Sequence, residues 1–231
     1  MAQAQVDLIT SVGWMQADGR AARSFSFFDT FRYERNLKRV IDILLASVLL
    51  VVTLPIWAVI AIAIKLDSSG PVIFRQERVG RGGKRFSFYK FRSMWADAEK
   101  QRQALLAMNE MNGPVFKMRS DPRITRLGRL LRRSSLDELP QLINVLRGDM
   151  SIVGPRPALP AEVGNYRPTD LVRLWVKPGL TCWWQVRGRS GCDFDTWMLY
   201  DREYVQNISL RIDLTIMLAT FRAVLTARGA Y

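Results

Sequence analysis

The chain has 231 residues, enough for one domain of ordinary size with a sizeable core. Its 34 Lys and Arg residues outnumber 21 Asp and Glu residues, giving a formal charge of +13, and 48% of the residues are hydrophobic. This hydrophobic fraction excludes a disordered polyelectrolyte. The charge predicts an anionic partner, such as a nucleic acid, a negative membrane surface or a phosphorylated substrate. Histidine is absent, which excludes histidine triads, imidazole metal sites and a histidine acid or base.

The two cysteines, Cys182 and Cys192, lie too far apart for the close pairing of a zinc or redox motif. We expect both to be reduced thiols in a domain that faces the cytoplasm. A single disulfide in a secreted protein is the alternative.

An uncharged, apolar run occupies residues 43–64 and is typical of a membrane helix, with a buried core helix as the alternative. Pro55 lies near the middle of this run and is expected to bend it. Basic clusters flank the run on both sides, and Lys/Arg-rich flanks prefer the cytoplasm. We therefore predict a re-entrant helix that breaks at Pro55 and leaves through the face by which it entered. A proline-kinked spanning helix is the alternative.

Two alternating runs, 72–79 and 84–93, flank a Gly-Arg-Gly-Gly turn and predict a β-hairpin. The second run places four side chains on one face: Phe86, Phe88, Lys90 and Arg92. Mixed basic and aromatic side chains also occur on nucleic-acid-binding surfaces. A half-buried amphipathic hairpin is the alternative.

A basic amphipathic helix of the type that lies on anionic membranes is expected to begin at residue 123, with a solvated helix face as the alternative. Four arginines recur there at helical spacing: Arg123, Arg126, Arg129 and Arg133. A second helix is expected directly afterwards, with Ser134 or Ser135 as its N-cap and Asp137 and Glu138 in its first turn.

The remaining segments indicate a mixed fold that is mostly helical. The expected elements are a polar helix or lid at 95–112, a short strand at 150–153, a rigid Gly-Pro-Arg-Pro loop at 154–157, an aromatic and basic loop region at 173–189, and one helix at 196–227.

The adjacent acids Asp137 and Glu138 carry the strongest chemical signal. Complementation of a helix dipole explains such a pair on its own. Here, however, Arg132 and Arg133 lie just before it, and arginines keep carboxylates ionised and hold phosphate oxygens. An aspartate can attack phosphorus, and a neighbouring carboxylate can hold Mg²⁺. Together with a membrane anchor, these residues indicate phosphoryl chemistry on a lipid-linked substrate.

From about Arg35 to the C-terminus the chain resembles the monotopic phosphoglycosyl transferases, also called bacterial sugar transferases. The segments that carry the resemblance are 38–55, 70–94, 132–157 (RRSSLDELPQLINVLRGDMSIVGPRP), 177–189 and the ending at 228–231. The family moves a sugar 1-phosphate from a nucleotide diphosphate sugar to a polyprenyl phosphate.

The resemblance implies an α+β, mostly helical fold in which a re-entrant membrane helix-break-helix carries a cytoplasmic catalytic domain. That domain is expected to contain a small β-hairpin and amphipathic interfacial helices. We expect a mobile N-terminal tail at 1–31, the re-entrant helix at 32–67 and the catalytic domain at 68–231.

The resemblance also implies roles for individual residues. Asp137 matches the nucleophile, Glu138 matches its partner associated with Mg²⁺, and Pro55 matches the helix break. Four basic residues match positions expected near the phosphates: Lys90, Arg92, Arg132 and Arg156. Four further residues fall in the loop associated with the nucleotide sugar: Pro178, Gly179, Gln185 and Arg189.

Two positions depart from the family pattern. Leu54 stands where the family often has Ser before the proline, so the helix break lacks one hydroxyl. Cys182 stands where the pattern Pro-Gly-x-Thr-Gly ends in glycine. A positive φ at that position would strain Cys182.

The resemblance implies a two-step reaction. Asp137 attacks the sugar-bearing phosphorus of a UDP-sugar, UMP leaves, and undecaprenyl phosphate takes the phosphosugar from the enzyme. The expected product is an undecaprenyl diphosphate-hexose, with glucose or galactose as the sugar. This would be the first membrane step of surface polysaccharide synthesis, on the cytoplasmic face of the bacterial inner membrane.

The sequence also bears on partners and on alternative functions. We expect no nucleic-acid partner, and the sequence leaves a homo-oligomer open. Two alternatives to the enzyme also remain: a membrane-tethered, basic nucleic-acid-binding module and a structural membrane scaffold, in which no single carboxylate would matter.

Overall fold

The computed structural model describes residues 33–188 and 191–226. They form a mostly helical structure with two small sheets and one long apolar helix. In chain order the elements are η1 (Tyr33–Leu37), α3 (Lys38–Asp67), β1 (Ile73–Val79), η2 (Arg81–Gly83), β2 (Arg85–Phe91), α4 (Ala98–Gln101), η3 (Gln103–Met108), α5 (Arg126–Arg133), η4 (Leu136–Glu138), α6 (Gln141–Arg147), β3 (Ser151–Val153), α7 (Pro160–Val163), η5 (Pro168–Trp175), β4 (Gly179–Thr181), α8 (Trp183–Arg187), α9 (Phe194–Gln206) and α10 (Leu210–Thr226).

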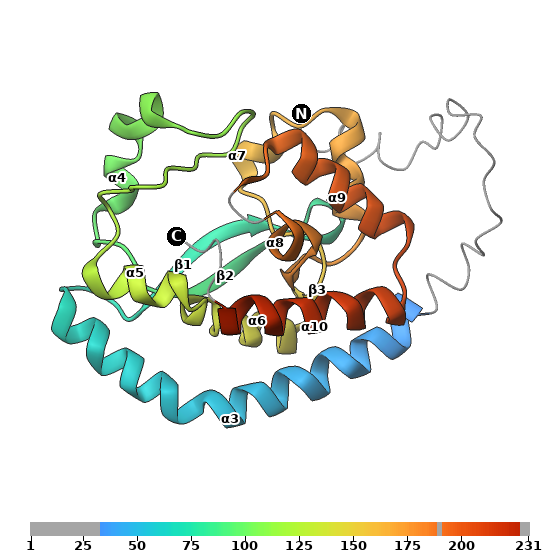
Figure 1. The fold of residues 1–231 in the computed structure, drawn as a ribbon, viewed down its shortest axis with the longest axis horizontal. Coiled ribbons are helices and arrows are strands. Elements are labelled where there is room, and N and C mark those ends of the chain that lie inside the picture. Colours follow the sequence, from blue (N-terminus) through green and yellow to red (C-terminus); the bar gives the residue numbers. More distant parts are fainter. Residues whose placement is uncertain (1–32, 189–190, 227–231) are drawn as a thin grey trace.

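Helix α3 is long and apolar enough to cross a membrane, by length and composition, and most of its surface is exposed. Where the sequence predicted a helix break at Pro55, α3 continues through this residue without dividing into two helices. Because proline removes one backbone donor, a long helix can bend at this position and still continue. In Figure 1, α3 is bowed, its two ends turn toward the rest of the molecule, and its middle lies farthest away.

Both ends of α3 are attached to the rest of the structure. Near its beginning, Arg39 donates hydrogen bonds to the carbonyl oxygens of Val145 and Leu146 at the end of α6. At its end, Arg92 donates to the carbonyl oxygens of Ile64 and Ser68. The middle of the helix presents apolar side chains outward; Val51 is 72% exposed.

The structure confirms the predicted hairpin. Strands β1 and β2 are antiparallel, and Gly82 in the turn has a φ of 65°. Phe88 and Phe91 of β2 are each only 2% exposed, so their rings are not available to stack on nucleic-acid bases. The face of β2 that carries Phe88 and Lys90 is shared by Arg78 of β1, which pairs with Phe86.

The connection that carries the acidic pair differs from the prediction. Helix α5 begins at Arg126 with Thr125 as its N-cap, while Arg123 is buried in an ion pair with Asp121. Ser135 occupies the N-cap position of the 3₁₀ turn η4, which contains Asp137 and Glu138 as expected, but its side chain makes no capping hydrogen bond. Ser135 adopts a left-handed conformation with a φ of 59° and leads into η4, and α6 begins only after Pro140.

The main core lies between α3, α6, the parallel strands β3 and β4, and helices α9 and α10. The predicted strand at 150–153 is confirmed as β3. The single helix expected at 196–227 is wrong. The chain forms α9 and α10, because Ile208 between them is buried at 2% exposure and Ser209 accepts a hydrogen bond from the backbone of Ile212. The segment expected as a polar helix or lid forms only the short elements α4 and η3.

Candidate active site

The structure brings together four of the predicted site residues from distant parts of the chain. Lys90 projects from β2, Asp137 and Glu138 lie in η4, and Arg156 lies in the Gly-Pro-Arg-Pro loop after β3. The Nζ atom of Lys90 is 2.7 Å from Oε1 of Glu138 and 3.5 Å from Oδ2 of Asp137. Nη1 of Arg156 donates to the same Oε1 at 3.0 Å. Two cations therefore converge on one carboxylate of the acidic pair.

The backbone before the pair is held in an unusual conformation. Ser135 is the only non-glycine residue with a positive φ among the described residues. Such conformations persist where the surrounding structure enforces them, and they cluster at functional sites. This turn directs the side chain of Asp137 inward, where the residue is 4% exposed.

The two acids have different electrostatic environments. Burial raises the pKa of Asp137 and, although Lys90 opposes this effect, the neighbouring Glu138 adds to it. Burial also acts on Glu138, but Lys90 and Arg156 together lower the pKa of Glu138 to about 2. Glu138 is therefore ionised at neutral pH. Asp137 is the more basic carboxylate, and hence the stronger nucleophile once it is ionised.

Arg132, at the end of α5, supplies a further cation near the pair. Its Nε donates to Oγ of Ser93 at 2.9 Å, and the guanidinium forms no ion pair with the described residues. Burial lowers the pKa of Arg132, and the nearby Asp137 opposes that shift. Arg132 therefore has donors left for the oxygens of a phosphate.

The structure places Arg92 away from this cluster. Its guanidinium donates to the carbonyl oxygens of Ile64, Ser68 and Pro71, and so closes the C-terminal end of α3. Alternation along β2 suggested that Arg92 shares the face of Lys90. The strand ends at Phe91, so the alternation does not extend to Arg92.

The predicted nucleotide-sugar loop packs directly against the Gly-Pro-Arg-Pro loop. The backbone N–H of Gly179 donates to Pro155, and a Cβ built on Gly179 would lie 2.0 Å from the backbone nitrogen of Gly154. Only glycine therefore allows this approach between Pro178-Gly179 and the loop that carries Arg156.

The remaining residues of this loop are placed as follows. Gln185 lies in α8, where its Oε1 accepts a hydrogen bond from Sγ of Cys182. Arg189 lies outside the described residues. The departure at Cys182 introduces no backbone strain, because its φ of −158° is in the extended region. Both cysteines are free and buried.

Sequence reasoning missed one basic residue beside the site. Arg78 donates from Nη1 to the carbonyl oxygen of Pro157, next to Arg156, and its guanidinium lies 5.4 Å from the ring centroid of Phe88. Burial and the neighbouring Arg156 lower the pKa of Arg78 to about 10. The hairpin register could have found it, because Arg78 lies opposite Phe86 on the face of Lys90.

A divalent metal ion would find few protein ligands here. No group of three or more Asp, Glu, Cys or His side chains that could hold a metal occurs among the described residues. Lys90 and Arg156 both bond Oε1 of Glu138, and the described residues donate no hydrogen bond to Oε2. One carboxylate oxygen together with substrate phosphate oxygens suits Mg²⁺, which is commonly held in this way.

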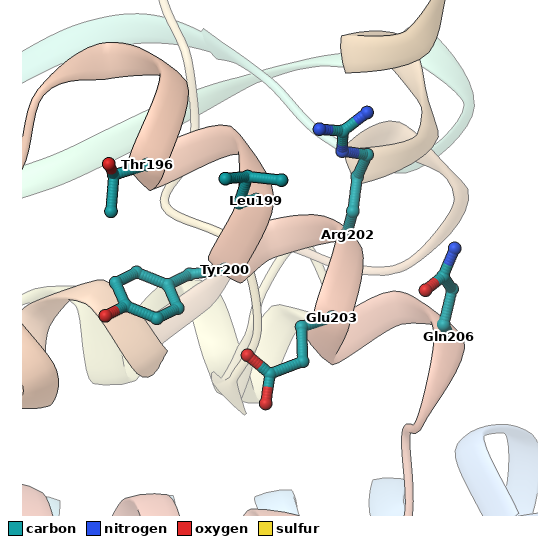
Figure 2. Close-up of a pocket in the computed structure, with 6 residues that line it drawn as sticks. All are labelled: Thr196, Leu199, Tyr200, Arg202, Glu203 and Gln206. Atoms are coloured by element: carbon teal, nitrogen blue, oxygen red, sulfur yellow. The ribbon is translucent and has the colours of Figure 1, made fainter.

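A separate open groove runs along α9, and Figure 2 shows the six side chains that line it. They are Thr196, Leu199, Tyr200, Arg202, Glu203 and Gln206. None of them is among the predicted site residues, so this groove is distinct from the acidic cluster, which consists of Asp137 and Glu138 with the cations Lys90 and Arg156.

Known proteins resemble this chain along most of its length. The model of the family described as bacterial sugar transferase matches residues 33–227. The galactosyl transferase CpsE of Streptococcus agalactiae is 49% identical over 162 residues, which cover 70% of this chain and 36% of the relative. The undecaprenyl-phosphate galactose phosphotransferase of Salmonella typhimurium is 43% identical over 208 residues, covering 87% of this chain and 43% of the relative.

A shorter relative matches along most of its length. The exopolysaccharide production protein ExoY of Rhizobium meliloti is 39% identical over 198 residues, which cover 84% of this chain and 88% of the relative. By contrast, the chain spans less than half the length of the Streptococcus and Salmonella proteins. The family match extends over most of the chain and includes every residue of the acidic cluster, so the chain belongs to the bacterial sugar transferase family.

Proposed function

We propose that this protein transfers a hexose 1-phosphate from a UDP-sugar to undecaprenyl phosphate, giving undecaprenyl diphosphate-hexose and UMP. The observation that carries the proposal is the convergence of Lys90 and Arg156 on the adjacent carboxylates Asp137 and Glu138. The names of relatives support the hexose: those from Salmonella typhimurium and Komagataeibacter xylinus are named as undecaprenyl-phosphate galactose and glucose phosphotransferases. The reaction would begin surface polysaccharide synthesis.

In the first step Asp137 attacks the sugar-bearing phosphorus. A bond forms between its carboxylate oxygen and phosphorus, the bond from phosphorus to the bridging oxygen breaks, and UMP leaves with that electron pair. In the second step a phosphate oxygen of undecaprenyl phosphate attacks the same phosphorus and releases Asp137. Both attacking groups are anions, so neither step needs a base to remove a proton. A reaction that needs no general base is consistent with a chain that has no histidine.

The basic residues would bind the charges of the diphosphate. Arg132 has free donors beside Asp137, and Arg156 fixes Glu138 from the opposite loop. We propose that Glu138 holds Mg²⁺ together with oxygens of the diphosphate, a donor set that selects a hard cation. When bound, the ion neutralises the diphosphate and the leaving phosphate.

The bowed shape of α3 supports a re-entrant membrane helix at 32–67, with the catalytic domain at 68–231 on the cytoplasmic face of the inner membrane. Both ends of α3 turn toward the rest of the structure (Figure 1) and contact it through hydrogen bonds. The exposed side chains in the middle of α3 are apolar. Two further helices expose apolar side chains and would lie on the membrane surface. These side chains are Leu130 of α5 and Leu214, Leu218 and Phe221 of α10.

The proposal is tested by supplying purified, membrane-reconstituted protein with undecaprenyl phosphate, Mg²⁺ and a panel of UDP-sugars. We expect release of UMP and formation of undecaprenyl diphosphate-hexose from UDP-glucose or UDP-galactose, and loss of both products in excess EDTA. No UMP from any UDP-sugar would overturn the proposal. Full turnover in EDTA would overturn the assignment of Mg²⁺ alone.

A further inference from the structure

A buried ion pair between Arg173 and Asp201 contacts the backbone of the loop that carries Arg156. Arg173, in η5, has its Nη2 atom 3.0 Å from Oδ2 of Asp201 in α9, and both side chains are 2% exposed. The exposed ion pair between Arg167 and Asp195, by contrast, leaves more than half of each side chain in solvent. Removing two charges from water is costly, and apolar residues often stabilise a core equally well. The buried pair therefore calls for an explanation other than stability.

The contacts of Arg173 supply that explanation. Its Nη2 donates to the backbone carbonyl of Arg156 at 2.7 Å, and its Nη1 donates to the hydroxyl of Tyr166 at 2.7 Å. The guanidinium also lies 5.7 Å from the ring centroid of Trp197 in α9. Arg173 therefore connects α9 to the backbone of the residue whose side chain holds Glu138.

We propose that Arg173 and Asp201 are positioning residues that hold Arg156 in the orientation needed to bind Glu138 and the donor diphosphate. Oδ2 of Asp201 accepts no hydrogen bond from the described residues, so the negative charge of Asp201 holds the guanidinium of Arg173 by electrostatic attraction. Arg173 in turn holds the carbonyl of Arg156 by a hydrogen bond. This inference rests on the proposed function. Neither Arg173 nor Asp201 touches the reacting atoms, so both act only through Arg156.

The charge state of Asp201 should make the positioning of Arg156 depend on pH. Burial raises the pKa of Asp201 to about 6, even though Arg173 favours its ionised form. The other titratable groups near Asp201 are Tyr166 and Cys182, and burial raises the pKa of each. Asp201 therefore loses its charge as the pH falls through about 6, Arg173 loses its charged partner, and Arg156 is held less firmly. The donor step should slow on the acidic side.

The test is a double-mutant cycle on UMP release from the UDP-sugar without acceptor. Asp201→Asn keeps the size of the side chain but removes its charge, and we expect the rate to fall about tenfold or more. Its matched control is Asp195→Asn, the same substitution in the exposed ion pair on the same helix, for which we expect less than about a twofold change. In an Arg156→Lys background, Asp201→Asn should have little further effect, because the residue it positions is already altered.

A second variant covers the case in which Asp201→Asn does not fold. Tyr166→Phe removes only the hydroxyl that accepts from Arg173, and it should give a smaller loss with the same dependence on Arg156. Where Asp201→Asn does fold, its rate should also lose the part of the acidic limb that we expect near pH 6 from Asp201, while the part that comes from Asp137 should remain.

The outcomes separate this inference from the proposed function. Equal losses from Asp201→Asn in the wild-type and Arg156→Lys backgrounds, or a normal rate in both Asp201→Asn and Tyr166→Phe, would overturn the positioning role while UMP release by the wild-type protein still stands. A wild-type protein that releases no UMP would overturn both.

Discussion

At the scale of single residues, the placement of Asp137 depends on the left-handed conformation of Ser135. This residue turns the chain from α5 into η4 with a φ of 59°, a region that glycine adopts freely and β-branched residues adopt poorly. The carboxylate of Asp137 is buried directly after this turn. The conformation of residue 135 therefore determines where the carboxylate lies.

We predict opposite behaviour for two substitutions of Ser135. Ser135→Gly should keep UMP release within about threefold of wild type, because glycine reaches this φ without strain. Ser135→Val should lower the rate about tenfold or more and reduce thermal stability, because a branched side chain disfavours the turn. UMP release and thermal unfolding measure the two effects. Equal activity of both variants would show that the turn does not position Asp137.

Lys90 determines the charge state of both acids, which makes a pH measurement informative. Together with Arg156 it lowers the pKa of Glu138 to about 2, and it opposes the rise in the pKa of Asp137. Removing this cation should therefore raise both pKa values, so that ionised acids are lost at a higher pH.

Lys90→Met should consequently slow UMP release and shift its acidic limb to higher pH. Lys84→Met, which removes an exposed lysine from the same hairpin, serves as the control and should leave the profile unchanged. The rate of UMP release, measured against pH for both variants and the wild type, shows whether the acidic limb has shifted. A slower Lys90→Met with an unshifted limb would mean that Lys90 acts on the substrate and not on the acids.

At the scale of elements, local patterns predicted what depends on local physics. Alternation and a glycine-rich turn predicted the β1–β2 hairpin, and an uncharged apolar run predicted α3. The surroundings of Asp137, which lies in the 3₁₀ turn η4 and not in the first turn of an α-helix, were not predictable in this way. Its carboxylate faces Lys90, 47 residues away in sequence, so tertiary contacts replace the expected contacts with a helix N-terminus.

Two other differences between prediction and structure have similar causes. The break between α9 and α10 depends on the burial of Ile208 in the main core, which a helical pattern does not reveal. The role of Arg92 depends on where β2 ends, since the residue lies one position beyond the strand and closes α3 instead. For the site, the residue pattern itself singled out the pair Asp137 and Glu138. The resemblance added their roles and the basic residues Lys90 and Arg156, whereas the contacts of Arg78 and Arg173 required the folded chain.

The topology of α3 gives a prediction at the same scale. Cysteines introduced as Asn36→Cys and Ser69→Cys lie at exposed positions just outside the two ends of the helix, while Cys182 and Cys192 are buried. A re-entrant helix keeps both ends in the cytoplasm. A membrane-impermeant thiol reagent should therefore label neither site in intact cells and both sites after permeabilisation.

Pro55 provides the matching variant. Pro55→Leu restores the missing backbone hydrogen bond and straightens the helix, which should favour a membrane span and expose one introduced cysteine to the reagent. Leu54→Ala, at the neighbouring position, should leave the labelling unchanged. Labelling of a single site in the protein that retains Pro55 would establish a span and contradict the re-entrant helix.

At the scale of the whole molecule, the positive charge and the exposed apolar side chains both suit binding to an anionic membrane surface. The formal charge of +13 includes Arg126, Arg129 and Arg133 on the exposed face of α5, beside the exposed Leu130. Such a face suits an anionic membrane surface. Helix α5 leads through Ser135 to Asp137, so the acidic pair lies a short distance along the chain from the surface proposed to rest on the membrane.

The central claim is a covalent phosphosugar on Asp137, and a burst experiment with labelled donor tests it most directly. The protein is mixed with UDP-sugar carrying label in the sugar phosphate, without undecaprenyl phosphate. We predict one burst of UMP, no larger than the amount of enzyme, and label on Asp137. Asp137→Asn should show neither burst nor label, whereas Glu138→Gln, which lacks the carboxylate proposed to hold Mg²⁺, should accumulate label slowly. No UMP without acceptor, together with unlabelled enzyme, would contradict the covalent route, and label on Glu138 would reverse the roles of the two acids.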